Sequence, residues 1–448
     1  MIKYFKFFLF SKITPDFLNT FLNQGFKLIS GPLLLLLLPT FINEETQGYW
    51  FSFMSLSSLS ALADMGFTVI ILQFSAHEYA YLKVRNNFFY PRDHYHFIHL
   101  LRLATLLKFI LKWSFTLVLI TFPIILIFGF KLFNSNVKFS WEIPWILFVI
   151  GSAINFYNNV FLSFFEGCDN VSKTQKIRFI NSVIYFGILF IFLVLGQGLF
   201  ALAYSILISS ILTFFFSYIK FKFTLHQLIR INKLYKFSWL KEFWQYFSKY
   251  GFSVAIGYMT IQLYTPLVFK FYGAEASGKV GLTMSLVTAI FSIGNIWFQS
   301  IAPKFNILSS EKKWHDLDSF YNRMIKNTVY TYSFVCFCFV FSYVGLKMTK
   351  FDIITHRFLP LSSILVLMGH WFIQNFTYGY GFYLRSFKRE PFLKLSIYNA
   401  ILFLLLTFFM FRYFNVEYVF FVHLITSIII FPFAAHIFNK KKKLWTQV

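Results

Sequence analysis

Three titratable side chains lie inside long apolar runs of this sequence, where a charge is costly. Lys27 and Asp64 belong to the first two runs, and His370 belongs to a later one. An ionised group in the middle of a bilayer costs about 2.5–3.5 kcal/mol or more, so it persists where it has a partner or a task. We expect Lys27 and Asp64 either to pair with each other or to act in the function. We expect His370 either to relay protons or to make a hydrogen bond.

Polar residues recur at helical spacing within the same runs. In the first run, Asn23, Lys27 and Gly31 follow one another at steps of four. Polar groups in a membrane helix must face the protein interior or a wet cavity. Stripes on several helices therefore indicate a shared hydrophilic path, whose candidate residues are Asn23, Gln24, Lys27, Asp64, Asn155, Asn159, Asn295, Gln299, His370 and Gln374. The alternative for each uncharged member is a hydrogen bond between helices, worth about 0.6 kcal/mol on average.

Other patterns that carry chemistry are weak in this sequence. It has no Gly-x4-Gly-Lys-Ser/Thr phosphate loop. Asp316-Leu317-Asp318 matches a metal-binding pattern of sugar transferases, but its loop at 304–326 is too short for a nucleotide-sugar domain. His94, His96 and His99 have a poor spacing for zinc and favour an interfacial loop. We therefore expect no metal, no cofactor and no catalytic residue.

Long apolar runs must position the polar residues. The chain has 448 residues, of which 58% are hydrophobic and 13% are charged, whereas a soluble domain has about 25% charged residues. A bilayer core about 30 Å thick needs roughly 20 apolar residues per helix. Windows of about that length predict twelve membrane spans, at 17–42, 47–76, 113–130, 144–165, 179–196, 199–219, 250–271, 280–303, 328–346, 358–384, 392–411 and 417–438.

The placement of lysine and arginine predicts the orientation of these spans. With a cytoplasmic N-terminus, 32 of the 41 Lys and Arg residues fall in cytoplasmic segments, 8 fall in outer segments, and Lys27 lies within a span. This bias is what the positive-inside rule requires, so both termini are predicted to be cytoplasmic. Most of the net charge of +24 is therefore a topology signal, and we expect no nucleic-acid partner.

The chain also contains an internal repeat. Residues 43–56 align without gaps on residues 273–286, and each stretch lies at the outer turn between the first two spans of its half. Six spans separate the copies, which indicates a parallel repeat typical of transporters that work by alternating access. We predict an all-α integral membrane fold of about twelve transmembrane helices, with six-helix halves at 1–230 and 231–448 around a central cavity.

Several stretches resemble a known family of membrane proteins. They are Gly31-Pro32 with the leucine run to Pro39, Gly48-Tyr49-Trp50, Ala63-Asp64-Met65-Gly66-Phe67, Gln73 to Ala80, Tyr250-Gly251-Phe252, Tyr272-Gly273-Ala274 through Gly278, and Ala302-Pro303-Lys304. With these stretches the chain resembles the O-antigen and capsule repeat-unit flippases (Wzx type) of the multidrug/oligosaccharidyl-lipid/polysaccharide exporter superfamily. Overall length and the six-plus-six organisation extend the resemblance over the whole chain. The sparse intramembrane charge is a departure, because relatives usually carry more Arg or Lys in the lumen than the single Lys27.

The resemblance implies a fold like that of multidrug exporters (MATE-like) and a carrier of lipid-linked sugar. Its substrate would be an oligosaccharide on undecaprenyl diphosphate, moved from the cytoplasmic to the periplasmic leaflet of the bacterial inner membrane during O-antigen or related polysaccharide biosynthesis. Lys27, Lys249, Lys270 and Arg385 are candidate contacts of the diphosphate, and Asp64 is the candidate for ion coupling. Membrane lipid is an expected partner, and a polysaccharide polymerase and a chain-length regulator are candidate partners.

Two other classes of protein stay open. A multidrug exporter of the same superfamily would share the fold but would need acidic residues in its cavity for cationic drugs. A membrane O-antigen polymerase or glycosyltransferase would be expected to carry a large periplasmic loop with paired arginines or carboxylates. The predicted outer segments are all short, so we expect a transporter rather than an enzyme.

Overall fold

The fold is described from a computed structural model of the chain. It describes residues 15–60, 64, 66–85, 87–133, 140–231, 237–240, 242–244, 256, 263–298, 308–309, 313–348, 355–387 and 391–446. These residues are mostly helical, with a two-stranded sheet. The chain divides into two compact units, Met1–Ser30 with Leu56–Ala255 and Gly31–Ser55 with Ile256–Val448. Residues 31–55 thus pack with the second unit, and the predicted halves with a boundary at residue 230 stay a prediction.

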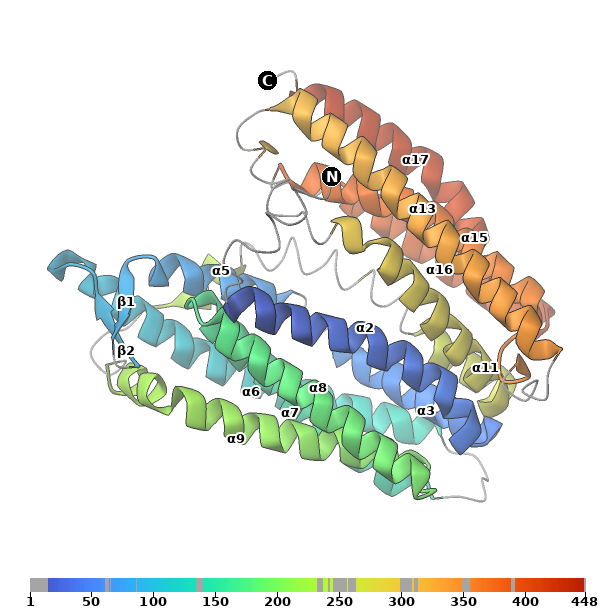
Figure 1. Ribbon diagram of the computed structural model, residues 1–448, viewed down its shortest axis with the longest axis horizontal. Coiled ribbons are helices and arrows are strands. Elements are labelled where there is room, and N and C mark those ends of the chain that lie inside the picture. Colours follow the sequence, from blue (N-terminus) through green and yellow to red (C-terminus); the bar gives the residue numbers. More distant parts are fainter. Residues whose placement is uncertain are drawn as a thin grey trace, which may run out of the picture. The chain divides into compact units, whose positions relative to one another are not determined.

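The first unit is built from long helices that pack side by side, with the main contacts between α7 and α9, α8 and α9, and α5 and α7 (Figure 1). Its elements are the first part of α2 (Pro15–Phe41), then α5 (Phe67–Tyr79), β1 (Leu82–Arg85), β2 (Phe88–Pro91), η1 (His94–His96), α6 (Phe97–Leu132), α7 (Glu142–Gly167), α8 (Val171–Val194) and α9 (Leu199–Ile231). Short turns join α7 to α8 and α8 to α9, which makes these neighbours antiparallel.

The second unit is also helical, with the main contacts between α15 and α17, α11 and α13, and α16 and α17. Its elements are the rest of α2, most of α3 (Glu44–Ser58), α11 (Tyr264–Gly294), α13 (Trp314–Lys347), α15 (Leu361–Arg385), α16 (Leu393–Tyr413), η3 (Val416–Tyr418) and α17 (Phe421–Thr446). α11 contains a kink at Gly273, whose φ of 86° and ψ of 179° are not helical. This kink lies in the predicted outer turn between the spans at 250–271 and 280–303.

Among the described residues, eight helices are long and apolar enough to cross a membrane. Most follow the predicted spans, as α7 follows the span at 144–165. α6 begins at Phe97, well before the predicted span at 113–130, because its basic residues stay helical where the helix leaves the apolar region. The span predicted at 250–271 lies largely outside the described residues.

The span predicted at 47–76 is not one continuous helix in the residues that the structure describes. α3 ends at Ser58, and α5 begins at Phe67. Gly66, directly before α5, has a φ of 77°, a left-handed conformation that favours glycine and interrupts a helix. The apolar composition of this stretch does not reveal the interruption at Gly66. A hydropathy window predicts whether a segment can cross the bilayer, but it does not report the backbone conformation of single residues.

A β-hairpin follows α5, where the sequence predicts an interfacial loop. β1 and β2 pair antiparallel, with Leu82 opposite Pro91. Gln227 near the end of α9 accepts from the backbone nitrogen of Phe89 at 2.8 Å and donates to its carbonyl oxygen at 2.7 Å. The side chain of Gln227 thus satisfies a backbone pair that a short hairpin leaves open at its edge.

α3 and α11 approach each other closely inside the second unit. A Cβ atom added at Gly48 would lie 1.8 Å from the carbonyl oxygen of Ala274, and one added at Gly278 would lie 2.8 Å from the backbone nitrogen of Gly48. Gln47 Nε2 donates to the carbonyl oxygen of Gly278 at 3.0 Å. Only glycine fits at these two positions, as in other contacts of membrane helices through small residues.

This contact follows the internal repeat. With the offset of 230 residues, Glu44 corresponds to Ala274 and Gly48 corresponds to Gly278. The Cβ position of Gly48 meets Ala274, and that of Gly278 meets the carbonyl oxygen of Glu44 at 3.0 Å, so each contact is the counterpart of the other. Such reciprocal contacts indicate an approximate two-fold axis. The two copies of the repeat therefore pack against each other.

Gly48→Ala and Gly278→Ala should each lower the free energy of unfolding by about 1–3 kcal/mol, because the added methyl group overlaps backbone atoms. Gly345→Ala on α13 is the matched control, since nothing lies within 4 Å of its Cβ position, and there the change should be neutral or stabilising. Thermal unfolding of the detergent-purified variants measures the difference. Wild-type stability of both Gly48→Ala and Gly278→Ala would contradict the close contact.

Candidate functional site

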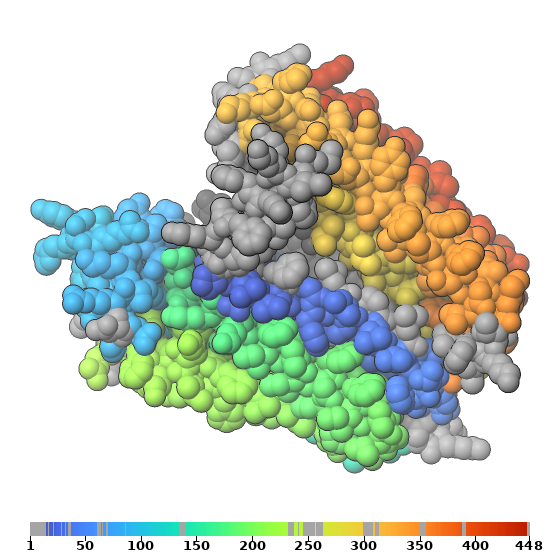
Figure 2. Space-filling view, viewed as in Figure 1, coloured from blue at the N-terminus to red at the C-terminus, as the bar shows by residue number. Residues whose placement is uncertain are grey.

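The polar side of α2 packs against α8 in the first unit. Asn23 is 1% exposed, and its Nδ2 donates to Gln175 Oε1 at 2.8 Å. One turn earlier, Asn19 Nδ2 donates to Ser172 Oγ at 2.7 Å. Figure 2 shows these two helices, blue and green, adjoining on one face of the molecule. Asn23, a predicted member of the hydrophilic path, therefore joins helices.

Gln175 continues into an ionic network near the start of α8. Its Nε2 donates to Glu166 Oε1 at 2.8 Å, and Arg178 Nη1 pairs with Glu166 Oε2 at 2.6 Å. Arg178 Nη2 also donates to Ser163 Oγ at 3.3 Å. The carboxylate and the guanidinium are mostly removed from water, so each stabilises the charge of the other.

Lys27 differs from Asn23 on the same helix α2, because Asn23 is buried whereas Lys27 is exposed. It forms no ion pair with any residue that the structure describes, and its charge lies within electrostatic range of Arg178. We call Lys27 and Arg178 the cationic patch. It combines one cation that is balanced by Glu166 with one that is not.

Asp64 does not pair with Lys27 but holds the first turn of α5. Its Oδ1 accepts from the backbone nitrogen of Thr68 at 3.2 Å, and its Oδ2 accepts from Thr68 Oγ1 at 3.0 Å. The first backbone N–H groups of a helix lack partners within it, and the carboxylate supplies one. The interpretation that Lys27 and Asp64 pair with each other is therefore wrong.

Predicted path residues of the second unit also bond to other helices. Asn295 is 1% exposed, and its Nδ2 donates to the carbonyl oxygen of Phe291 and to Asn375 Oδ1, both at 2.9 Å. Gln374 Nε2 donates to Ser427 Oγ at 3.2 Å. His370 is buried beside α17. These contacts fit the alternative in which polar residues connect membrane helices.

The other candidates are more accessible or lie elsewhere. Asn155 is partly exposed, and four others are exposed, namely Gln24, Asn159, Lys270 and Arg385. Lys249 and Gln299 lie outside the described residues. Lys27 belongs to the first unit, whereas Lys270 and Arg385 belong to the second.

The sequence pattern does not identify two polar residues that contact other helices in the first unit. By sequence Arg178 belongs to a cytoplasmic loop, yet α8 begins at Val171 and places Arg178 two turns inside the helix. Asn158 is 2% exposed, and its Nδ2 donates to the carbonyl oxygen of Ser210 at 2.8 Å. The signal for Arg178 is Asp169-Asn170, residue types that favour a helix start. No local signal distinguishes Asn158 from the asparagine that follows it.

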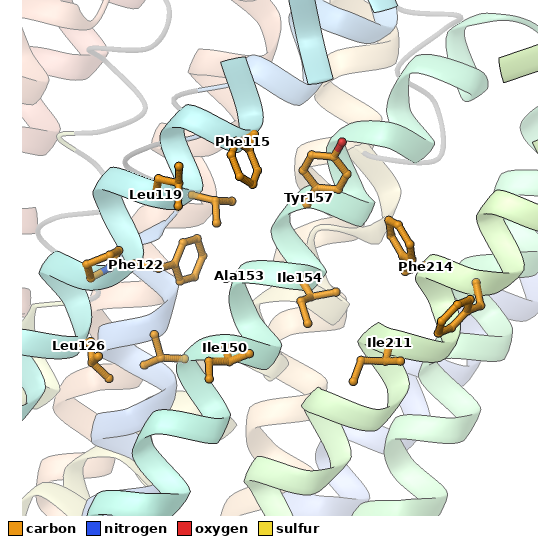
Figure 3. Close-up of a pocket in the computed structure, with 14 residues that line it drawn as sticks. Phe115, Leu119, Phe122, Leu126, Ile150, Ala153, Ile154, Tyr157, Ile211 and Phe214 are labelled. Atoms are coloured by element: carbon orange, nitrogen blue, oxygen red, sulfur yellow. The ribbon is translucent and has the colours of Figure 1, made fainter. Parts of the chain in front are cut away.

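An apolar groove of about 710 Å³ lies on the first unit between α6, α7 and α9 (Figure 3). Its lining is aliphatic and aromatic, and Tyr157 contributes a hydroxyl group at one end. Phe115 and Phe215 in this lining are more than half exposed. Such a surface suits hydrocarbon rather than phosphate or sugar hydroxyls, whose burial without hydrogen bonds is costly. The candidate site for a polar ligand is therefore the cationic patch and not this groove.

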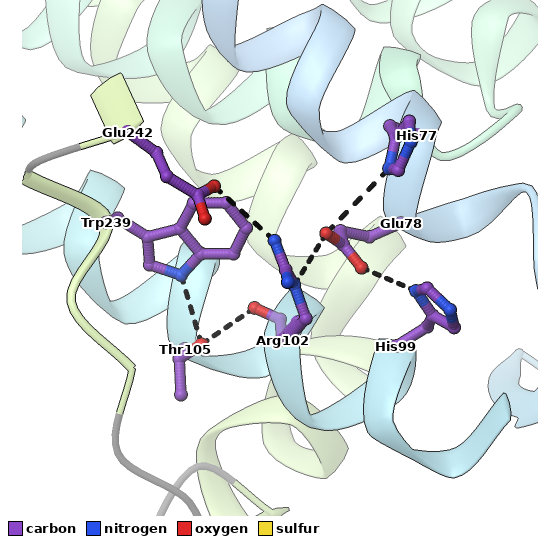
Figure 4. A network of polar contacts seen from close by, with 7 residues as sticks. All are labelled: His77, Glu78, His99, Arg102, Thr105, Trp239 and Glu242. Carbon is purple, nitrogen blue, oxygen red and sulfur yellow. Dashed lines mark hydrogen bonds and ion pairs between the residues drawn. The ribbon is translucent and has the colours of Figure 1, made fainter. Parts of the chain in front are cut away.

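A buried ion-pair network joins the end of α5 to the start of α6 (Figure 4). The Glu78 side chain is 2% exposed and pairs with Arg102 Nε and His99 Nδ1, each at 2.8 Å. Trp239 Nε1 donates to Thr105 Oγ1 at 3.1 Å, and Arg102 lies over the Trp239 ring, 5.1 Å from its centroid. Trp239 comes from the segment after α9, so this network docks that segment on the first unit.

Comparison with known sequences does not assign this chain to a family. No protein-family model matches this chain. A curated protein described as the niacin/nicotinamide transporter NiaP of Bacillus subtilis (strain 168) is 29% identical over 126 residues, which are 28% of this chain and 28% of that protein. The chain therefore matches little more than a quarter of this relative.

Comparison with solved structures gives the fold. A multidrug resistance MATE family transporter of the MOP superfamily, in an inward-facing conformation, matches 92% of this chain and 99% of its own, with a TM-score of 0.59 and 16% identity. A MOP superfamily transporter from Pyrococcus furiosus, whose binding pocket is described as having reverse polarity, matches 95% and 96%, with a TM-score of 0.54 and 13% identity. The chain is a multi-pass membrane protein with the MATE fold, which confirms the predicted class.

Glu78→Gln should lower the free energy of unfolding by about 3 kcal/mol, because it leaves Arg102 without its buried charge partner. Lys108→Gln is the control, since Lys108 is exposed on the same helix α6, and its effect should stay within about 0.5 kcal/mol. Thermal unfolding of the two variants in the same detergent makes the comparison. Equal effects of the two substitutions would show that the network does not stabilise the first unit.

Proposed function

We propose that this membrane protein with the MATE fold is a transporter that moves an oligosaccharide on undecaprenyl diphosphate from the cytoplasmic to the periplasmic leaflet of the bacterial inner membrane. The fold supports transport, because the solved structures that share it are transporters. The reciprocal contact of α3 with α11 supports alternating access, because repeats related by a common axis can rock against each other.

The cationic patch is the observation that carries this proposal. Glu166 balances Arg178, whereas Lys27 has no ion-pair partner among the described residues, so the patch has an excess positive charge. A guanidinium has five N–H donors, and the contacts with Glu166 and Ser163 use two of those of Arg178. The remaining donors and the Lys27 ammonium suit the oxygen atoms of a diphosphate.

The polyprenyl chain and the sugars of the proposed substrate also have suitable surroundings in this protein. The polyprenyl chain stays in the hydrocarbon while the head group crosses, and the exposed amides of Gln24 and Asn159 suit sugar hydroxyls. An ion gradient, coupled through Asp64, or the gradient of the lipid itself would drive the step. A polysaccharide polymerase and a chain-length regulator are the proposed partners.

A multidrug exporter is the second candidate, and Asp64 favours it. A partly buried carboxylate in a membrane helix can bind a cationic drug, and one structural neighbour is a multidrug resistance transporter. The excess positive charge of the cationic patch opposes such a ligand, which is why we place the lipid-linked diphosphate first. A polymerase or glycosyltransferase is not favoured, because the structural neighbours are transporters.

Deletion of the gene in its host, followed by lipid analysis of each leaflet, tests the proposal. We expect undecaprenyl-linked single units to remain on the cytoplasmic side and polymerised surface polysaccharide to be lost. Normal polysaccharide with raised drug sensitivity would overturn the flippase proposal in favour of the exporter. Single units that reach the periplasmic leaflet but are never joined would assign the chain to polymerisation.

Lys27→Ala and Arg178→Ala should each reduce translocation roughly tenfold or more, since a hydrogen bond to a charged group contributes about 1.5–3 kcal/mol. Lys27→Arg and Arg178→Lys keep the charge and should retain more activity. Lys131→Ala, an exposed change in the last turn of α6, is the control. Complementation of the deletion strain, with electrophoresis of the surface polysaccharide, measures all five. Full complementation by both alanine variants at equal protein level would exclude the patch as the substrate site.

A further inference from the structure

Two histidines lie together inside the second unit. His370 on α15 and His423 on α17 are 8% and 4% exposed, and their ring centroids are 5.3 Å apart. His370 Nδ1 lies 2.8 Å from the carbonyl oxygen of His423 and 2.6 Å from Ser427 Oγ. A carbonyl oxygen only accepts, so Nδ1 of His370 carries the proton of the neutral ring, and its Nε2 is left with a basic lone pair.

The ring of His423 lies among apolar and aromatic side chains of the described residues. Within the described part of the chain, neither its Nδ1 nor its Nε2 makes a hydrogen bond. The rings of Tyr264 and Phe403 lie edge-on to it, with ring centroids at 4.5 and 4.9 Å and interplanar angles of 82° and 81°. The Tyr264 hydroxyl donates to the carbonyl oxygen of Val419 instead of serving the imidazole. A buried polar atom without a hydrogen-bond partner destabilises the fold, and a phenylalanine at this position would avoid that cost.

Burial makes the proton affinity of this pair depend on conformation. The titratable group that faces it from α11 is Tyr264, and the polar groups that face it from α15 and α17 are Gln374 and Ser427, all neutral side chains. An imidazolium enclosed by neutral groups loses its hydration without compensation, so a charge on either ring is unfavourable in this conformation. In a conformation that admits water, the same rings bind protons as ordinary imidazoles do.

The predicted topology places the pair in the outer half of the membrane. Both α15 and α17 begin on the outer side, and His423 is the third residue of α17. His370 is the tenth residue of α15, roughly 14 Å along that helix. Protons that enter from the outer side therefore reach the pair after a short path, once the helices separate enough to admit water.

We propose that His370 and His423 form a proton-binding site that favours an open, hydrated second unit when it is protonated, so that a proton gradient drives the conformational cycle. A group that binds a proton more tightly in one conformation shifts the equilibrium towards that conformation. This inference goes beyond the proposed function, because it concerns the energy source and holds for any transported molecule. It adds a coupling site in the second unit to the candidate Asp64 in the first.

Amide hydrogen–deuterium exchange of α15 and α17 tests this inference without a substrate. The full-length protein in lipid nanodiscs is labelled at about pH 7.5 and about pH 5.5, on either side of the imidazole titration. The rates are corrected for the intrinsic effect of pH on amide exchange. We expect peptides of α15 and α17 to exchange roughly fivefold faster or more at the lower pH, the lower end of typical coupling between sites.

Glutamine substitutions identify the responsible groups. His370→Gln and His423→Gln keep a polar side chain but cannot bind a proton, so exchange should no longer differ between the two pH values. His436→Gln, an exposed change on the same helix α17, is the matched control and should respond as the wild type does. His423→Phe is a second replacement, so that a folding defect in one variant does not decide the result.

The inference is overturned if the wild type exchanges equally at both pH values, or if the folded variants at positions 370 and 423 keep the full response. Because no substrate is present, either result is independent of whether the chain translocates a lipid-linked sugar. A negative result in the gene-deletion experiment together with a positive one here would leave a proton-coupled transporter of another substrate.

Discussion

The close approach of α3 to α11 is the contact on which the second unit depends. Gly48 and Gly278 let the two helix backbones touch, Gln47 then bonds across the contact, and Lys279 on α11 forms an ion pair with α3. In lipid the hydrophobic effect does not hold helices together, so close packing and interhelical hydrogen bonds must do so. This is the physical reason that residues 31–55 pack with the second unit although they are distant from it in sequence.

Two carboxylates that are largely removed from water, Glu78 and Glu166, are each balanced by a cation. Glu78 pairs with Arg102, and Glu166 pairs with Arg178. Lys27 differs as an exposed cation without an ion-pair partner among the described residues, and the histidine pair differs as buried titratable groups among neutral ones. Because neither arrangement is favoured by stability alone, these two features carry the proposals for substrate binding and for energy coupling.

The candidate site was predictable as a set of helix faces but not residue by residue. The spacing of polar residues indicates one face of a helix, yet successive residues differ by about 100° around the axis. Asn23 is buried and Gln24 is exposed, and Asn158 is buried where Asn159 is exposed. Which member of each pair faces a neighbouring helix depends on how that helix packs, and this information is not in the local pattern.

The sequence by itself determined that this protein crosses the membrane many times with an all-α fold and an internal repeat, because those properties depend on composition and spacing over about 20 residues. Only the tertiary structure decided the reciprocal contact of the repeats, the pairing of Glu166 with Arg178 and the meeting of His370 with His423. These contacts join different helices. They depend on the rotation and approach of whole helices, which many distant side chains set together.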